Sequence, residues 1–288
     1  MMTKTIQDFR NYLLQLGYSK SSVYMLPECV KEFLEYHSTT TPEAVTQKHI
    51  ESFYNWLQVR PHKRNEGGLS ESYIYHHVYA LKLFFSYLEE TGQIKYNPIS
   101  VMKFKRPKHN TREPLTKAEI NRLFETAQTL KETAMLHLFY SCGLRRSEAV
   151  ELNTKDIHFK SCLLYVREGK GHKRRAIPMT VKVSEELENY YLQERSDSQR
   201  KAKDTEAFIL NRIGSRMRGD SYNRIIKEIV KTSGIARLCT LHHLRHSIAT
   251  HLLENGLSLE NVRDFLGHSY LEATQIYTKV SKYQLKSL

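Results

Sequence analysis

The sequence predicts a mainly α-helical protein with one small β-sheet, an α+β fold in two domains. Apolar residues recur at helical spacing through the first hundred residues and through most of the last hundred. Only residues 163–167 alternate as a strand does, and a second extended run follows at 176–179. A stretch with several prolines, 97–114, interrupts the helical pattern. We therefore expect a helical domain at residues 1–96, a linker at 97–114 and a second domain at 115–288.

The first domain is expected to be a compact bundle of four amphipathic helices with short loops. The first helix stops at Gly17, and Pro27 should kink the second helix or mark its true start. Thr46 and Ser70 have side chains that suit the N-caps of the third and fourth helices. Gly92 is expected to end the fourth helix.

The second domain is expected to open with a capping box formed by Thr116 and Glu119. A largely apolar helix follows at 132–141. The two extended runs flank residues 168–173, which contain the glycines of a hairpin turn. The remainder, 181–288, is predicted to be mostly helical.

Charge gives the first indication of function. Lys and Arg number 44 against 31 Asp and Glu, a formal net charge of +13. A basic excess of this size favours a polyanionic partner, usually nucleic acid, although many basic proteins bind none. Acidic residues form few clusters, so a two-metal nuclease site is not apparent.

The same composition argues against a membrane or secreted protein. No run approaches the ~18–20 apolar residues that a membrane span needs. The first ten residues carry acid and base and lack the apolar core of a signal peptide. We therefore expect a cytoplasmic protein with no membrane partner. Scattered cysteines without a Cys-x-x-Cys pair favour buried reduced thiols over a zinc cage or a disulfide framework; they are Cys29, Cys142, Cys162 and Cys239.

The linker is basic as well as rich in proline. Because its cations coincide with a hinge, we expect it to lie on the phosphates of DNA. The alternative is a linker that is merely solvated. The expected DNA-binding residues are Lys103, Lys105, Arg106, Lys108 and Arg112.

Two patches in the second domain could place a cation on a phosphate. Arg145 and Glu148 follow Gly143 at i, i+3, so they share a helical face and the carboxylate could hold the guanidinium. Ser147 is expected to cap that helix. Lys170 lies between two glycines at the hairpin tip, from which it can reach a phosphate or a leaving oxygen. The alternatives are an ordinary surface ion pair and a solvated turn.

A third patch gathers histidines around an arginine. His242 and Arg245 lie at i, i+3 and project from one helical face. A fixed positive charge at Arg245 disfavours a metal, and no His-Glu-x-x-His arrangement supplies a carboxylate. A His/Arg pair better suits an anion whose charge grows during a reaction. The competing metal site would use His242 or His243 with His246 and His251.

The fourth patch consists of His268 and Tyr277, nine residues apart. At about 100° per residue, nine steps place them on opposite faces of one continuous helix. They converge only if the chain breaks between them, and residues 267–270 offer a break. A tyrosine alone is usually a core residue, and this chain has 18.

Together these side chains suit attack on a phosphodiester. Arginines neutralise its non-bridging oxygens in bidentate fashion. A phenol has a pKa of about 10, so it needs help to lose its proton at neutral pH. The departing 5′ oxygen needs a proton from an acid such as lysine. Because guanidinium groups can hold the transition-state charge, we expect no metal and no other cofactor.

The ordered series of motifs resembles that of the tyrosine recombinase, or phage integrase, family. Order and rough spacing match over nearly the whole chain. Because the chain starts almost directly with the helical bundle, it resembles the compact Xer-like and transposon recombinases, without a separate arm-binding domain. The motifs are Gly-Leu-Arg145-Arg-Ser-Glu148, Gly-Lys170-Gly-x-Lys, His242-x-x-Arg245-His-x-x-Ala-Thr-His251, Leu-Gly-His268 and Tyr277.

The resemblance implies a site-specific recombinase that closes on DNA as a C-shaped clamp. Its helical core-binding, SAM-like domain and its catalytic domain would lie on opposite faces of the duplex. Tyr277 would attack the scissile phosphate, giving a 3′-phosphotyrosyl link and a free 5′ hydroxyl. The 5′ hydroxyl of a partner strand would then release the tyrosine, without ATP.

The resemblance also implies a role for each remaining residue. Arg145 and Arg245 would bind the non-bridging oxygens, and Glu148 would buttress them. Lys170 would be the general acid, with Lys173 as a second candidate. The histidines would act beside them, His242 as proton acceptor or donor near the tyrosine and His268 as a hydrogen-bond donor to the phosphate.

The partners implied are double-stranded DNA with specific recombination sites and further copies of the chain. Four protomers on two sites are expected, as a homotetramer or as a heterotetramer with a paralogue. The tail, residues 278–288, either docks on a neighbour or frays. Two alternatives remain: strand relaxation as in type IB topoisomerases, and a non-catalytic DNA-binding protein, against which the intact set of residues speaks. The target sequence, and the choice between integration, excision, inversion and dimer resolution, stay open.

Overall fold

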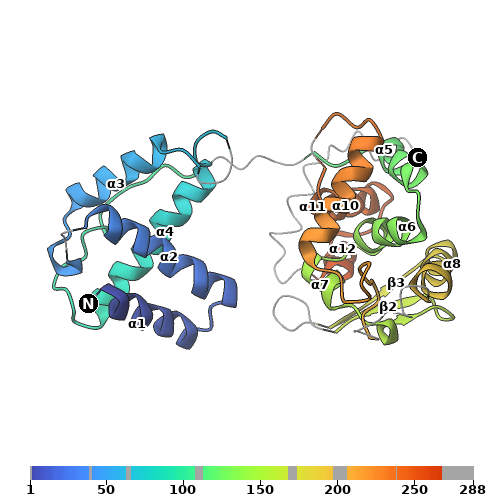
Figure 1. Ribbon diagram of the computed structural model, residues 1–288, viewed down its shortest axis with the longest axis horizontal. Coiled ribbons are helices and arrows are strands. Elements are labelled where there is room, and N and C mark those ends of the chain that lie inside the picture. Colours follow the sequence, from blue (N-terminus) through green and yellow to red (C-terminus); the bar gives the residue numbers. More distant parts are fainter. Residues whose placement is uncertain are drawn as a thin grey trace. The chain divides into compact units, whose positions relative to one another are not determined.

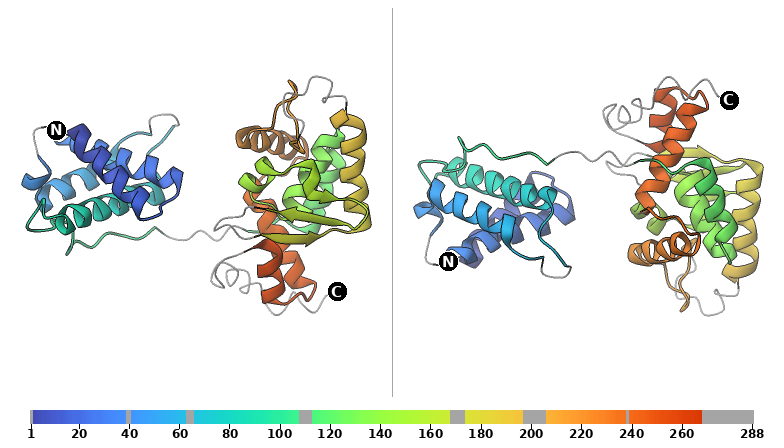
Figure 2. Two further views of the ribbon diagram at one scale, coloured as in Figure 1. Left: turned by 90° about the horizontal axis from the view of Figure 1, so that it is seen from below. Right: turned by 90° about the horizontal axis from the view of Figure 1, so that it is seen from above.

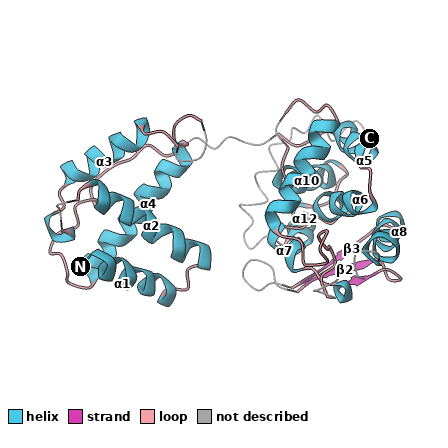
Figure 3. Cartoon of the chain, viewed as in Figure 1, coloured by secondary structure: helices cyan, strands magenta, loops and turns pink. Residues whose placement is uncertain are grey.

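The computed structural model describes residues 2–38, 41–62, 66–107, 113–167, 174–196, 206–237 and 239–267. Helices dominate these residues, and the strands form one three-stranded antiparallel sheet (Figures 1 and 3). The predicted fold class, mainly α with a small sheet, is confirmed. By its internal contacts the chain divides into two compact units, Met1–Asn110 and Thr111–Leu288.

The first unit is a bundle of four helices and one short 3₁₀ turn. Ser19, Thr46 and Ser70 occupy the N-cap positions of the second, third and fourth helices. Pro27 lies inside the second helix, so it does not mark the helix start. The elements are α1 (Met2–Gln15), α2 (Lys20–Tyr36), η1 (Pro42–Ala44), α3 (Gln47–Val59) and α4 (Glu71–Glu90).

Aromatic rings fill the core of this bundle. Phe33 contacts Phe53 and Phe85 edge to face, with ring centroids 5.2 and 6.1 Å apart. Phe9 and Phe84, from α1 and α4, make a similar contact at 5.3 Å. Edge-to-face pairs of buried rings add to the apolar burial that holds the four helices together.

The beginning of the expected linker packs on the first unit. Ile99 is buried in the core of the bundle, and Phe104 lies against it. The Phe104 ring contacts Tyr54 of α3 with centroids 5.1 Å apart, and the Lys82 amine of α4 lies 5.7 Å from the centre of the same ring. The chain therefore stays attached to the bundle for several residues beyond position 97.

The second unit contains the sheet and most of the short helices. The Thr116–Glu119 capping box is present and opens α5, as predicted. The helical elements are α5 (Lys117–Thr126), α6 (Leu130–Leu136), the π-helical turn η2 (His137–Ser141), α7 (Arg146–Glu151), η3 (Thr154–Asp156), α8 (Val181–Asn189), η4 (Tyr190–Glu194), α10 (Gly219–Thr232), α11 (Leu241–Glu254) and α12 (Leu259–Leu266).

The sheet is ordered β1-β2-β3 and consists of β1 (Ile157–His158), β2 (Leu163–Val166) and β3 (Arg175–Pro178). The sequence predicted the last two strands but missed β1, because two residues are too few to show an alternation. In the register of β2 with β3, Val166 is opposite Arg175 and Leu164 is opposite Ile177. Residues 168–173, between these strands, lie outside the described residues.

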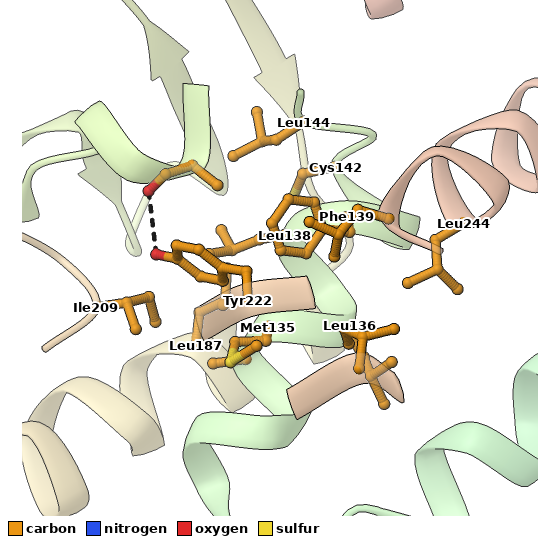
Figure 4. Packing of buried hydrophobic residues seen from close by; sticks show 14 of the residues in the cluster. Met135, Leu136, Leu138, Phe139, Cys142, Leu144, Leu187, Ile209, Tyr222 and Leu244 are labelled. Atoms are coloured by element: carbon orange, nitrogen blue, oxygen red, sulfur yellow. Dashed lines mark hydrogen bonds between the residues drawn. The ribbon is translucent and has the colours of Figure 1, made fainter. Parts of the chain in front are cut away.

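The core of the second unit surrounds α6 and η2, the apolar stretch predicted as one helix. Met135, Leu138 and Phe139 are fully buried, and Figure 4 shows them packed with Tyr222 of α10. The Tyr222 hydroxyl donates a hydrogen bond to the Ala149 carbonyl oxygen at 3.2 Å. Beside this core, α11 and α12 are neighbours (Figure 2). They pack on each other through Ala249, Val262 and Leu266.

Candidate active site

Two glycines allow the end of α12 to approach the turn before α7. Gly143 has φ +58°, and a Cβ there would come within 2.9 Å of the Leu266 side chain. Gly267 ends α12 with φ +65°, and a Cβ there would come within 2.9 Å of an Arg175 nitrogen. Because only glycine fits both the left-handed backbone and the space, these residues determine how closely the segments meet.

Glu148 is the buried centre of the site. Its carboxylate accepts hydrogen bonds from the backbone N–H and Nη1 of Arg145, at 2.8 and 2.7 Å. It also accepts from Nη1 and Nη2 of Arg175, at 2.9 and 2.8 Å. A third guanidinium, of Arg245, has Nη1 3.8 Å from the same carboxylate. One carboxylate thus binds Arg145 at the N-cap of α7 and Arg175 on β3, and lies close to Arg245 on α11.

This environment keeps Glu148 ionised. Burial by itself raises the pKa of the carboxyl, but the hydrogen bonds and charge of Arg175 and Arg145 outweigh burial and lower the pKa to about 2. Glu148 is therefore a carboxylate at any pH at which the protein is expected to work.

The three arginines also bind the end of α12. Arg175 donates from Nε to the Phe265 carbonyl oxygen at 2.9 Å, and Arg145 donates from Nη2 to that of Gly267 at 2.8 Å. Arg245 donates from Nη2 to the Leu266 carbonyl oxygen at 2.7 Å and from Nη1 to that of Gly143. The last carbonyls of a helix have no partner within it and carry partial negative charge, which explains why cations collect there.

Charge is not balanced in this cluster. Among the residues that the structure describes, three guanidinium groups face one carboxylate, an excess of two positive charges in a partly buried place. Arg145 is the most accessible of the three, with 21% of its side chain exposed, whereas Arg175 and Arg245 are almost fully buried. A buried excess of positive charge is costly unless an anion binds, and a phosphodiester is such an anion.

The pairing of Arg145 with Glu148 was predicted, but the helix start was not. The expectation that Ser147 caps α7 is wrong, because Arg145 occupies the N-cap position and Glu148 accepts from its backbone N–H. The Glu148 carboxylate therefore both caps the start of α7 and fixes the Arg145 guanidinium.

The histidines of α11 have separate environments. His242 is exposed and precedes Arg245 by three residues, so both project from the same side of the helix. His243 caps the helix start through Thr240, with Nδ1 2.8 Å from the hydroxyl. His251 is buried with its Nδ1 2.8 Å from the Tyr140 hydroxyl. Within the described ranges, no three metal-binding side chains gather in one place.

Several expected site residues lie outside the described residues, namely Lys108, Arg112, Lys170, Lys173, His268 and Tyr277. Of the expected linker contacts, Lys103, Lys105 and Arg106 are exposed. The Lys105 amine lies 2.9 Å from the Glu71 carboxylate of α4, a surface ion pair of small energy.

Arg175 was missed by the sequence reasoning, although the sequence contained a signal for it. Strand residues two apart share a face, and Ile177 is apolar and fully buried. Arg175 therefore points inward from the strand, where a charged residue needs a buried partner. That partner is Glu148.

Comparison with known protein families shows to which family this chain belongs. The sequence pattern of the phage integrase family matches residues 113–284, and that of the phage integrase N-terminal SAM-like domain matches residues 5–94. The chain belongs to the phage integrase family. The expected resemblance to tyrosine recombinases is therefore confirmed, and this recombinase has both of the family's domains.

Curated relatives cover the full chain. It is 31% identical over 297 residues to tyrosine recombinase XerD of Listeria innocua, which covers 100% of this chain and 97% of the relative. It is 32% identical over 287 residues to a tyrosine recombinase of Pseudothermotoga lettingae, covering 97% and 94%. The protein is thus an Xer-like tyrosine recombinase, an enzyme that transfers DNA strands in site-specific recombination. Relaxation without site pairing and non-catalytic binding are not favoured.

Solved structures agree in fold. A XerA recombinase matches with a TM-score of 0.56 and 25% identity, over 98% of this chain and 96% of that one. XerH bound to a palindromic difH substrate matches with a TM-score of 0.73 and 21% identity, over 92% and 78%. Among the described residues, every helix is too short or too polar to cross a membrane.

Proposed function

We propose that this recombinase cleaves DNA by attack of the Tyr277 phenol oxygen on the scissile phosphorus. The O–P bond to Tyr277 forms as the bond to the 5′ oxygen breaks, which gives a 3′-phosphotyrosyl link and a free 5′ hydroxyl. The 5′ hydroxyl of the partner strand then attacks the phosphotyrosyl phosphorus, which forms a new phosphodiester and releases Tyr277. Bond number is conserved, so the reaction needs no ATP.

The observation that carries this proposal is the arginine cluster on Glu148. Arg145, at the N-cap of α7, and Arg245, on α11, supply positive charge. Arg145 is hydrogen-bonded to the Glu148 carboxylate, Arg245 lies 3.8 Å from it, and both donate to carbonyls at the end of α12. A phosphodiester gains negative charge when it becomes pentacoordinate. Fixed donors that match this developing charge lower the barrier more than they tighten substrate binding.

We assign the remaining roles to His242, to Lys170 or Lys173, and to His268. His242, exposed on the Arg245 side of α11, accepts the phenol proton or returns it. Lys170 protonates the leaving 5′ oxygen, with Lys173 as the competing acid. His268 donates a hydrogen bond to the phosphate. Support for the last three comes from their positions in the family's motif series, because they lie outside the described residues.

On the DNA we propose four protomers on two specific sites, as a homotetramer or with a paralogue. The helical unit at 1–96 and the catalytic unit at 115–288 each bind the duplex, and the basic residues of 97–114 contact phosphates. Relatives with this fold have been solved on DNA, such as XerH on its difH substrate, which supports DNA as the partner. We place the enzyme in the cytoplasm on nucleoid DNA, where such sites occur.

Covalent trapping tests the nucleophile. The probe is a DNA duplex from the region beside the gene, chosen because the protein protects it from nuclease digestion. It is nicked near the cleavage position, so that cleavage releases a short fragment and the strand cannot be resealed. Wild type should become linked to DNA in a denaturing gel, and Tyr277→Phe should bind equally but never link. Tyr96→Phe, an exposed tyrosine of the first unit, is the control. Linkage by Tyr277→Phe, or none by wild type bound to this probe, would overturn the proposal.

A sulfur substrate decides which lysine is the acid. A 5′-bridging thiolate leaves without a proton, so an enzyme that lacks its general acid should regain cleavage on it. Lys170→Ala should lose cleavage of the oxygen substrate and recover on the sulfur substrate, whereas Lys173→Ala should cleave both. The reverse pattern would assign the acid to Lys173.

A further inference from the structure

Arg175 belongs to the site by position but has no role in the chemistry assigned above. Its side chain is almost fully buried, and each of its three nitrogens already donates a hydrogen bond to a protein oxygen. Two of these hydrogen bonds go to the Glu148 carboxylate and one goes to the Phe265 carbonyl oxygen. A residue with these contacts can affect the reaction only through the groups that it holds.

We propose that Arg175 is a positioning residue, which aligns the phosphate-binding arginines and the end of α12 by fixing Glu148 and the Phe265 carbonyl at the same time. The proposal rests on the recombinase chemistry assigned above. It extends the site to β3, whose first residue is Arg175. One guanidinium then joins α7, through Glu148, to the end of α12, through Phe265.

The contact geometry requires an arginine. Nη1 and Nη2 each donate to one carboxylate oxygen of Glu148, at 2.9 and 2.8 Å, while Nε donates to Phe265 at 2.9 Å. A planar fork with donors on two sides makes these three contacts together, whereas a lysine ammonium is a point charge on a flexible stem. Lysine at 175 would keep the charge and lose the alignment.

The close fit around Arg175 supports the same conclusion. A Cβ on Gly267 would lie 2.9 Å from Nη1 and 3.1 Å from Cδ of Arg175, so the guanidinium packs directly on the last turn of α12. The next carbonyls of that turn bind Arg245 and Arg145. A shift of Arg175 therefore moves the acceptors that orient both phosphate-binding arginines.

Arg175 also keeps its carboxylate partner charged. Burial raises the pKa of Glu148, and Arg175 supplies the largest opposing effect, with further lowering from Arg145. The charged groups recorded against Glu148 are Arg145, Arg175 and Arg245. If Arg175 is replaced by a neutral residue, the pKa of Glu148 rises, and protonation at low pH then releases Arg145.

Single-turnover cleavage of the nicked duplex described above tests the proposal. The variants are Arg175→Lys and Arg175→Gln, and the matched control is Arg174→Lys at the exposed neighbouring position. We expect both Arg175 variants to cleave about 10²-fold more slowly, since a small misalignment of reacting groups costs about that much. DNA affinity and melting temperature of Arg175→Lys should stay near wild type, as should every property of Arg174→Lys.

The pH profile separates alignment from stability. Arg175→Gln should lose cleavage as the pH falls, with an acidic limb at higher pH than in wild type or Arg175→Lys. Wild-type rates in both Arg175 variants, or losses that merely follow lower melting temperatures or weaker DNA binding, would overturn the positioning role. Wild type and Tyr277→Phe are assayed in parallel with the Arg175 variants. If wild type itself does not become covalently linked to DNA, the proposed function fails. If the Arg175 variants become linked to DNA at the normal rate, only the positioning role of Arg175 is excluded.

Discussion

Each unit of the molecule contains a glutamate bound to arginine, partly buried in the first unit and fully buried in the second, and the two clusters differ in charge. In the first unit, Glu32 of α2 lies 3.0 Å from Nη2 of Arg60 and 3.6 Å from Nε2 of His77 on α4. In the second unit, Glu148 binds Arg145 and Arg175 and lies near Arg245. Among the described residues, Glu32 pairs with one arginine, whereas Glu148 has three arginines within 4 Å.

His77 does not add charge to the first cluster. Burial lowers its pKa to about 4, although Glu32 pulls in the opposite direction. Glu32 and Arg60 thus neutralise each other and brace α2 against the end of α3. Buried ion pairs add little net stability, so a balanced pair suits a structural contact. The unbalanced cluster is held in part by the carbonyls at the end of α12, and its remaining positive charge can bind a further anion. Charge balance thus separates a structural ion pair from a site suited to an anionic substrate.

The largest expected effect comes from neutralising the two glutamates. Glu148→Gln should destabilise the second unit by about 3–5 kcal/mol, because three guanidinium groups lose their counter-charge. Glu32→Gln should cost the first unit only about 1–3 kcal/mol, because the amide oxygen still accepts from Arg60. The one tryptophan, Trp56, lies on α3, so its fluorescence reports the first unit, while far-ultraviolet circular dichroism reports both.

In denaturant titrations Glu32→Gln should shift the fluorescence transition, and Glu148→Gln should shift only the dichroism transition. Glu148→Gln should also slow DNA cleavage, whereas Glu32→Gln should not. Equal destabilisation by the two substitutions would contradict the difference in charge balance.

The next effect is acid sensitivity of the first unit. The pKa of His77 in the folded protein is about 4, below its ordinary value of 6.5, so the folded state holds fewer protons than the unfolded state between these pH values. Stability is full above pH 6.5 and falls by about 3 kcal/mol as the pH drops to 4, at 1.36 kcal/mol per unit. Among the described residues, the charged or titratable groups near His77 include Glu32, Arg60, His76 and Tyr73.

His77→Gln should reduce the dependence of the first unit's stability on pH. As the pH falls from 6.5 to 4, the denaturant concentration at the midpoint of the Trp56 fluorescence transition should decrease for wild type and should decrease much less for the variant. The Glu148 cluster behaves differently, because its depressed pKa of about 2 keeps its stabilisation until the pH falls below the ordinary carboxyl value of 4.5. A wild-type curve that stays flat from pH 6.5 to 4 would refute the assignment.

The smallest effect compares two glycines with similar backbones. Gly92 has φ +70° with open space around it, whereas Gly143 has φ +58° and lies against Leu266. Alanine should cost about 1–2 kcal/mol at either position through the left-handed backbone. At Gly143 the new Cβ also pushes on Leu266, whose carbonyl holds Arg245. The melting temperature should therefore fall further for Gly143→Ala than for Gly92→Ala, and only Gly143→Ala should cleave DNA more slowly. Identical behaviour of the pair would show that the close approach is unimportant.

Local features of the fold were readable from the sequence. The caps at Thr46, Ser70 and Thr116 follow from side chains that can accept a neighbouring N–H. The Arg145–Glu148 pair follows from helical spacing, although the helix begins at a different residue than Ser147 would suggest. These features depend on residues a few positions apart, which is the range over which periodicity carries information.

Contacts between distant segments were not readable. Arg245 reaches the carbonyls of Gly143 and Leu266 only after α11, α12 and the turn before α7 have packed together. The role of Arg175 depends on the register that aligns it with Val166 and on the burial of Ile177. No spacing rule connects positions 148, 175 and 265, because tertiary packing alone brings them together.

The three carbonyls at the end of α12 have a kinetic consequence. Arginines that are bonded to protein oxygens before DNA arrives have already lost most of their rotameric freedom during folding, an entropy of up to about 2 kcal/mol for each side chain. A phosphate that reaches Arg145 and Arg245 does not have to order them. The same pair is ready again as soon as one strand has been exchanged, which suits an enzyme that must break and reseal several strands in succession.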